Sequence, residues 1–195
     1  MKHTKLLFLA LIFMASYSCK EAKKETKDVM ENKDIIAKEI KAEEEIKTLK
    51  FSLEPKSGSN VKGEVSFTEE NGTVSMKATL AGLTPGEHAI HIHEKADCSS
   101  EDGKSTGGHW NPTFSAHGKW GSAEGYHRGD IGNFTADGEG NATVEFSTDE
   151  WCLGCDDETK NLLGKGVIVH QGVDDFVTQP TGDAGGRVSC AGIIE

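Results

Sequence analysis

Residues 86–94 read Gly86-Glu87-His88-Ala89-Ile90-His91-Ile92-His93-Glu94 and hold three of the eight histidines in this 195-residue chain. Side chains two positions apart lie on the same face of a strand. We therefore expect His91 and His93 to be neighbours, and Ile90 and Ile92 to enter a core. Two neighbouring imidazoles suit Cu, Zn, Ni or Fe. The motif is short, and taken alone it fits a polar strand face with surface histidines equally well.

Further metal-ligand types follow in residues 95–130, a long stretch without clear periodicity. They are His109, His117, His127 and Asp130. Their spacings of 8, 10 and 3 supply four nitrogen and oxygen ligands, which suit a closed tetrahedral zinc site. A bound metal would also explain how so long a loop is ordered in a compact domain. His170 ends the apolar run 167–169, and we expect it on a strand facing the first histidine pair.

The region 49–195 is predicted to be an all-β domain, because apolar residues alternate there with a period of two. Asn71-Gly72, between two such runs, is a strong hairpin signal. The expected strands include 61–69, 73–81, 86–94, 131–137, 141–147, one through Val167 and Val169, and 186–194. About eight short strands joined by turns indicate an antiparallel sandwich or barrel, with long loops at 95–130 and 171–185.

Residues 1–19 are predicted to be a targeting segment. Lys2 and Lys5 precede an apolar run at 6–15 that is too short to span a bilayer as a stable helix. Small residues then lead to Cys19, as in the lipobox of bacterial lipoproteins, although Tyr17 departs from that pattern. We expect a lipidated Cys19, with an ordinary secretory peptide as the alternative, and either reading places the mature protein outside the cytoplasm.

Residues 20–48 are predicted to be a charged tether, partly helical or disordered. Across residues 20–50, nine lysines balance nine acidic residues, without glycine, proline or aromatic residues. The few apolar residues are too sparse to build a core, and a coiled-coil helix is the weaker alternative.

The composition argues against nucleic acid as a partner, because binding phosphates needs basic surface and the net charge is −11. Five cysteines are an odd number for an exported protein. If Cys19 carries lipid, the other four can pair.

The chain resembles the copper–zinc superoxide dismutases over roughly residues 49–195. Several motifs of that family occur in its order. They are His88-Ala89-Ile90-His91-Ile92-His93-Glu94, Gly108-His109-Trp110-Asn111-Pro112, His127-Arg128-Gly129-Asp130-Ile131-Gly132-Asn133, Val169-His170 and Gly182-Asp183-Ala184-Gly185-Gly186-Arg187-Val188-Ser189-Cys190. The resemblance implies an eight-stranded antiparallel Greek-key β-sandwich or barrel with two long functional loops.

The resemblance also implies how two metals are divided among these residues. Copper would be held by His91, His93, His109 and His170. Zinc would be held by His109, His117, His127 and Asp130. In this arrangement His109 bridges the metals and, with Arg187, is catalytic.

Other residues receive supporting roles from the resemblance. Asp174 would join a copper-ligand histidine to a zinc-ligand histidine, and His88 would brace the copper strand through hydrogen bonds. Arg187 would lie at the mouth of the copper channel and dock the anionic substrate. The loop 177–182 is uncharged, so further steering is unassigned, with Lys95, Lys104, Lys119 and Lys165 as candidates only in principle.

The cysteines divide into two pairs. Cys98 and Cys190 match the intrasubunit disulfide of the family. Cys152 and Cys155 depart from the common family pattern, and a local disulfide is expected there, with a redox or metal-handling pair as the alternative. No histidine follows Cys155 directly, which excludes c-type haem attachment.

The function implied is dismutation of superoxide to O2 and H2O2 by a copper redox cycle, with zinc as a structural and tuning metal. With residues 1–19, this predicts antioxidant defence at a bacterial membrane, on the periplasmic or surface-facing side. The rivals are a non-enzymatic copper-binding lipoprotein, disfavoured because every expected ligand and Arg187 are present, and a purely structural surface module. No interface patch can be identified, and a homodimer is one open alternative.

Overall fold

The computed structural model describes residues 46–195, and the predicted targeting segment, Cys19 and most of the predicted tether lie outside the described residues. Eight strands and one short 3-10 helix occur in this part of the chain. They are β1 (Lys47–Pro55), β2 (Lys62–Glu70), β3 (Thr73–Ala81), β4 (Gly86–His93), η1 (Lys104–Thr106), β5 (Gly132–Ala136), β6 (Ala142–Thr148), β7 (Gly166–His170) and β8 (Arg187–Gly192). Strand β1 begins two residues before the expected boundary at 49, because Lys47 and Thr48 pair with Glu69 and Thr68 of β2.

Local sequence chemistry explains the hairpin between β2 and β3. Asn71 and Gly72 have φ angles of 52° and 71°, the left-handed region that a two-residue type I′ turn requires. This turn fixes the register, which places Phe67 opposite Met76 and Val65 opposite Ala78. The buried residues of β3 alternate with exposed ones, as its sequence pattern predicts.

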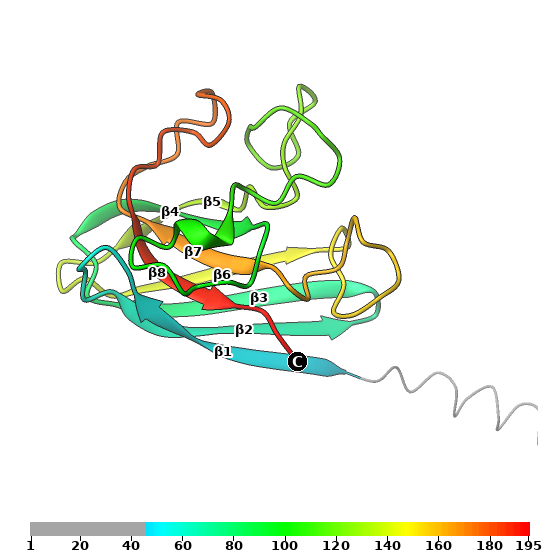
Figure 1. Cartoon of the computed structure of the whole chain (residues 1–195), viewed down its shortest axis with the longest axis horizontal. Coiled ribbons are helices and arrows are strands. Elements are labelled where there is room, and N and C mark those ends of the chain that lie inside the picture. The colour runs from blue at the N-terminus through cyan, green and yellow to red at the C-terminus, as the bar shows by residue number, and fades with distance from the viewer. Residues whose placement is uncertain (1–45) are drawn as a thin grey trace, which may run out of the picture. The chain divides into compact units, whose positions relative to one another are not determined.

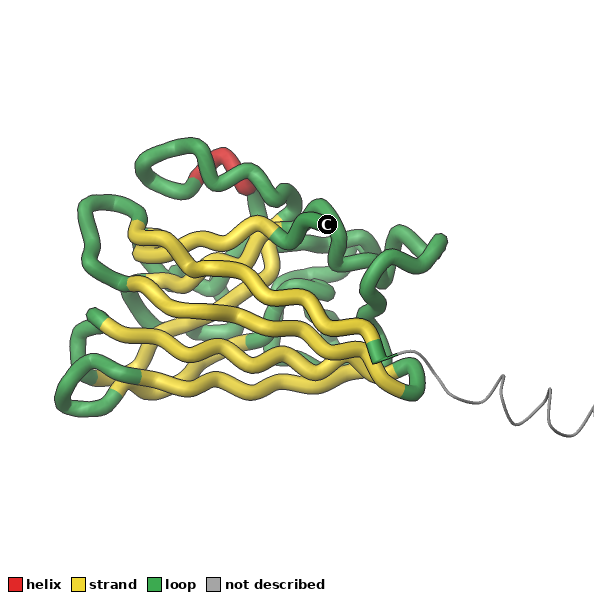
Figure 2. Tube along the Cα trace, turned by 90° about the horizontal axis from the view of Figure 1, so that it is seen from below, coloured by secondary structure: helices red, strands yellow, loops and turns green. Residues whose placement is uncertain are grey.

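The strands form one antiparallel sheet in the order β5-β4-β7-β8-β1-β2-β3-β6, which curls into a nearly closed barrel (Figures 1 and 2). The chain crosses between the two halves of the barrel after β3, after β5 and after β6, which is Greek-key connectivity. The predicted fold class is thus confirmed.

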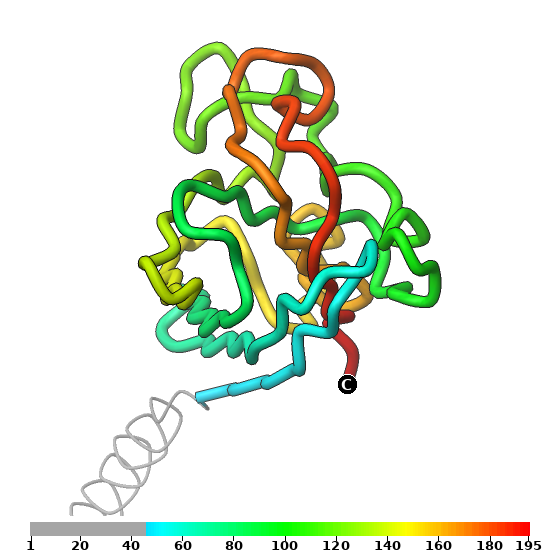
Figure 3. Tube along the Cα trace, turned by 90° about the vertical axis from the view of Figure 1, so that its left-hand side faces the viewer, coloured from blue at the N-terminus to red at the C-terminus, as the bar shows by residue number. Residues whose placement is uncertain are grey.

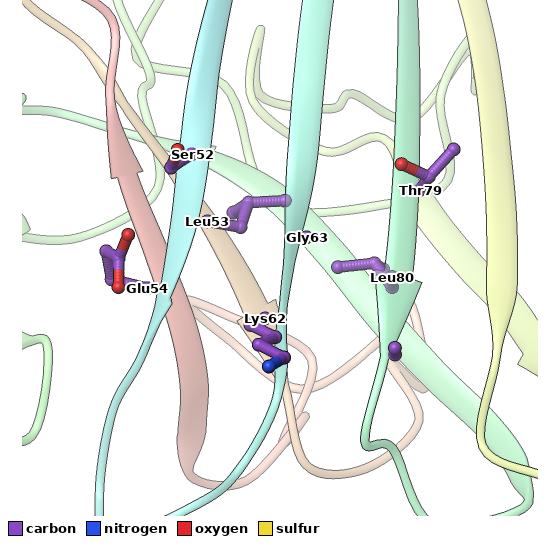
Figure 4. Close-up of a pocket in the computed structure, with 8 residues that line it drawn as sticks. Ser52, Leu53, Glu54, Lys62, Gly63, Thr79 and Leu80 are labelled. Carbon is purple, nitrogen blue, oxygen red and sulfur yellow. The ribbon is translucent and has the colours of Figure 1, made fainter.

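Inward-facing side chains fill the barrel, including Val65, Phe67, Met76, Ile90 and Ile92. A hollow of about 460 Å³ lies over β1, β2 and β3 at Gly63, which pairs with both Leu53 and Leu80 (Figure 4). A Cβ at Gly63 would lie 1.9 Å from the carbonyl oxygen of Thr79, so glycine is required at this crowded position. No histidine lines this hollow, and none of its lining residues belongs to the groups of candidate metal ligands.

Strand β4 is buried on both faces. Its residues from His88 to His93 are all buried, although only Ile90 and Ile92 belong to the apolar core. The opposite face is covered by the loops 94–131 and 171–186, which lie on the same side of the barrel (Figures 1 and 3). The long loops therefore close over the histidine face of β4.

Two disulfides occur among the described residues. Cys98–Cys190 joins the first long loop to β8, and Cys152–Cys155 closes a short loop between β6 and β7. Both pairings agree with the sequence-based expectation. Within residues 46–195, no helix is long and apolar enough to cross a membrane.

Candidate metal centre

Three elements bring the histidines together. Strand β4 carries His91 and His93, and the adjacent strand β7 ends at His170. His109 joins them because the long loop forms an isolated antiparallel bridge between His93 and His109. The predicted juxtaposition of His170 with the β4 pair is present, since its Nε2 lies 3.4 Å from Nε2 of His93.

Two groups of ligand-type residues result, and both are buried. One contains His91, His93, His109 and His170, and the other contains His109, His117, His127 and Asp130. Within each group, one nitrogen or oxygen atom per residue lies within 4.8 Å of the others. His109 belongs to both groups, so the two candidate sites share a residue.

The buried ring nitrogens show that these groups fit metals. Three of them have no hydrogen-bond partner: Nδ1 of His91, Nε2 of His109 and Nδ1 of His170. Nδ1 of His117 and Nδ1 of His127 lie 2.9 and 3.3 Å from the carboxylate of Asp130. An unpartnered buried nitrogen is costly unless something else binds it. A metal ion would satisfy this lone-pair requirement, and imidazole is a preferred ligand for both copper and zinc.

Asp174 connects the two groups. Its Oδ2 lies 2.9 Å from Nε2 of His91, and its Oδ1 lies 2.9 Å from Nε2 of His117. Both rings therefore donate their Nε2 hydrogen to Asp174 and keep Nδ1 as the ligand atom. Asn133 holds the backbone of Asp174, because its amide donates to the Asp174 carbonyl and accepts from the Asp174 N–H, each at 2.8 Å.

Burial keeps the imidazoles of the first group neutral. It lowers the pKa of His91 despite the contact with Asp174, and it lowers the pKa values of His93 and His170 well below 6.5. The pKa of His109 falls to about 4, because burial outweighs its hydrogen bond with Asp130. Neutral imidazole is the metal-binding form, so these rings are ready to bind at neutral pH.

The second group is organised by ionised carboxylates. Burial acts to raise the pKa of Asp130, but hydrogen bonds from His109, His117 and His127 hold it far below its usual range. Burial similarly acts against the hydrogen bonds that lower the pKa of Asp174. His117 lies between both carboxylates, which outweigh its burial and raise its pKa to about 9. The mixed histidine and carboxylate set suits zinc.

A family comparison identifies this arrangement. The model of the family described as Copper/zinc superoxide dismutase (SODC) matches residues 61–193, which is well over half of the chain. The chain belongs to the copper/zinc superoxide dismutase family. A protein named Superoxide dismutase [Cu-Zn] from Caulobacter vibrioides is 39% identical over 137 residues, which cover 68% of this chain and 78% of that relative.

Solved structures of similar proteins agree on the fold. A SOD-like protein from Bacillus subtilis has 27% identity and a TM-score of 0.66, covering 74% of this chain and 97% of that one. A double mutant of it has 29% identity and a TM-score of 0.67, with 75% and 97% covered. A protein titled the clock protein EA4 has 32% identity and a TM-score of 0.65, with 75% and 94% covered. Because one fold can support several functions, these structures show the fold, and the function is inferred from the site residues.

This copper/zinc superoxide dismutase catalyses the dismutation of superoxide to O2 and H2O2. Copper and zinc are its cofactors, and the two histidine groups provide places for both. The predicted family, enzyme class and cofactors are thus confirmed.

Arg187 lies at a small pocket of about 260 Å³ beside the first histidine group of the dismutase. His93, His170 and Arg187 line this pocket. The guanidinium donates to the carbonyls of Gly103 and Gly107, both at 2.8 Å, and to Oγ1 of Thr106 at 2.9 Å. These bonds use three of its five N–H donors and hold its orientation.

His88 lies outside both ligand groups. Its Nδ1 is 3.0 Å from the carbonyl oxygen of His170, and its Nε2 is 2.8 Å from that of Thr84. It therefore links the start of β4 to the end of β7, which is the location that a brace of the copper strand requires.

Sequence reasoning did not single out three residues that contact the site. They are Asn133, Gln179 and Thr106. Asn133 lies in the family motif at 127–133, but its contact with Asp174 depends on the path of the second long loop. Of the four lysines named as candidates for steering, Lys104 lines the pocket beside Arg187.

Proposed function

We propose that copper is held by His91, His93, His109 and His170, and zinc by His109, His117, His127 and Asp130. The observation that carries this division is the membership of His109 in both groups. Its Nδ1 lies 2.8 Å from Oδ1 of Asp130, while its buried Nε2 has no hydrogen-bond partner. A single imidazole with one nitrogen toward each group can bridge two metals.

Copper would supply the electron exchange with superoxide, and zinc would supply a fixed positive charge beside His109. The chain's residues supply geometry and a proton. Asp174 orients His91 and His117, and the Gly107 carbonyl orients His93 by accepting from its Nδ1 at 3.0 Å. Nε2 of His109 is the atom that would hold a proton and give it to peroxide, since it is the buried nitrogen facing the first group.

Arg187 is proposed to dock superoxide. The region from residue 51 onward has ten Lys and Arg against 23 Asp and Glu, a formal charge of −13, so its overall charge repels an anion. Attraction must therefore come from groups near the pocket. Arg187 has two N–H donors left over from its three backbone and hydroxyl contacts, and Lys104 adds a second cation, partly neutralised by Asp102 at 3.1 Å.

Replacing Arg187 with alanine should lower the second-order rate constant for superoxide by about tenfold at low salt. Lys104→Ala should cause a smaller decrease, because its charge is exposed and paired with Asp102. Both effects should shrink as salt rises, since the Debye length is about 10 Å at 0.1 M. Pulse radiolysis at several ionic strengths measures these rates.

The matched control is Lys119→Ala, which removes one exposed positive charge that does not line the pocket. Its rate should stay close to that of the unchanged enzyme. Equal decreases for Lys119→Ala and Arg187→Ala would show that net charge alone matters and would contradict the docking role.

The enzyme is also proposed to be a lipoprotein at a bacterial membrane, facing the periplasm or the surface. The support is the sequence of residues 1–19, with Lys2, Lys5, the apolar run and Cys19, followed by a charged tether to about residue 48. Under this proposal, superoxide removal takes place in the cell envelope.

Expression of the full chain in a bacterium supplied with labelled palmitate tests this location. The unchanged chain should incorporate label and sediment with membranes, while Cys19→Ala should do neither. Label in both chains, or in neither, would contradict lipidation of Cys19. Sedimentation velocity of the lipid-free domain distinguishes a homodimer from a monomer.

A further inference from the structure

Gln179 in the second long loop forms a double hydrogen bond with the backbone of His117. The N–H of His117 donates to Oε1 of Gln179, and Nε2 of Gln179 donates to the carbonyl of His117, each at 2.9 Å. One side-chain amide thus satisfies both backbone groups of a residue in a loop without regular structure. This mimics the pairing of two strands.

The loop that presents Gln179 is itself well fixed. The side chain of Asp175 accepts from the N–H groups of Val177 and Thr178 at 2.9 and 2.8 Å. The backbone closes around it, because the N–H of Gly182 donates to the Thr178 carbonyl at 2.7 Å. Gln179 therefore reaches His117 from a rigid turn rather than from a free loop tip.

His117 needs this support more than the histidines of β4 and β7 do. His91, His93 and His170 lie on strands, whereas His117 lies in the long loop. Its ring must fit between two carboxylates, with Nε2 2.9 Å from Asp174 and Nδ1 2.9 Å from Asp130. A small rotation of its backbone would move Nδ1 away from the second ligand group.

The second loop also packs directly on this ring. A Cβ at Gly182 would lie 1.8 Å from Oδ1 of Asp174 and 2.7 Å from Nε2 of His117. Gly182 has a φ of 68°, which favours glycine as well. The loop thus seals the contact between Asp174 and His117 while Gln179 holds the His117 backbone.

We propose that Gln179 is a positioning residue that fixes the His117 backbone, so that the His117 ring is set for zinc before the metal binds. This inference rests on the proposed zinc group, in which His117 is a ligand. Removing the amide should leave all four ligands present but less well arranged. Zinc should then be bound more weakly and in a changed geometry, since such supporting contacts typically change metal affinity by roughly 10–100-fold.

The test compares Gln179→Ala and Gln179→Glu with the unchanged enzyme and with Val177→Ala. Glutamate keeps the length and the acceptor but cannot donate to the His117 carbonyl. Val177 is in the same loop with its side chain 75% exposed, so its replacement controls for changes in the loop. The measurements are the rate of zinc release to a chromogenic chelator and the visible spectrum of Co²⁺ bound in place of zinc.

Both Gln179 variants should release zinc at least about tenfold faster and should show shifted cobalt bands, while Val177→Ala matches the unchanged enzyme. A merely stabilising side chain would not shift the cobalt bands. Native release rates and spectra in both variants would overturn the role of Gln179 while leaving the zinc assignment intact. If His117→Ala retains zinc as tightly as the unchanged enzyme, the zinc assignment fails, and the inference fails with it.

Discussion

His109→Ala should lower superoxide dismutase activity by roughly 100-fold or more, because it removes a residue common to both ligand groups. Each group would lose one of four ligands, and the proton-holding Nε2 would be lost as well. Copper and zinc contents should both fall in the purified variant. Metal analysis together with a direct superoxide decay assay measures the three effects on one preparation.

His127→Ala is the matched control, because His127 belongs only to the group that contains Asp130. This variant should lose zinc but keep copper. If His109→Ala instead lost one metal and kept the other at full occupancy, His109 would not be shared, and the proposed division of the ligands would be wrong.

The largest effect on stability should come from the Cys98–Cys190 disulfide. It joins residues 92 positions apart, and closing such a long loop restricts the unfolded chain by about 4–5 kcal/mol in the chain-entropy description. Replacing both cysteines with alanine should lower the free energy of unfolding by about this amount. Denaturant unfolding of the metal-loaded domain measures it.

The same change should also affect the substrate pocket. The disulfide holds the loop whose Gly103 and Gly107 carbonyls accept hydrogen bonds from Arg187. We therefore expect the double variant to be less active as well as less stable.

The Cys152–Cys155 disulfide offers an internal control, since it joins residues only three positions apart. Its removal should cost about 2 kcal/mol or less by the same argument. The short loop is also held by backbone hydrogen bonds between Cys152 and both Lys160 and Leu162. Equal losses from the two double variants would contradict loop closure as the source of the stability.

The strands could be predicted because their information is local. The alternation of β3 and the Asn71-Gly72 turn need no knowledge of distant residues, and both agree with the structure. The members of the two buried groups could be predicted from residue type and spacing, helped by the family motifs. Strand β1 begins two residues before the change of periodicity near residue 49, because its start is set by cross-strand pairing with β2.

The residues that support the ligands could not be predicted in the same way. Gln179 lies 62 positions from His117, and nothing in the sequence near either residue indicates the contact. Likewise, Lys104 could not be chosen among four lysines until the fold placed it at the pocket of Arg187. Such contacts depend on how two irregular loops meet, and no periodic pattern encodes that.

The most direct test of the two-metal account is the dismutation rate of the lipid-free domain, residues 20–195, after reconstitution with copper and zinc. We predict a rate constant near the diffusion limit of about 10⁸–10⁹ M⁻¹s⁻¹, with one copper and one zinc per chain and sensitivity to cyanide. Tight binding of copper without turnover would contradict the account, because the ligands of both groups and Arg187 would then be present without producing catalysis.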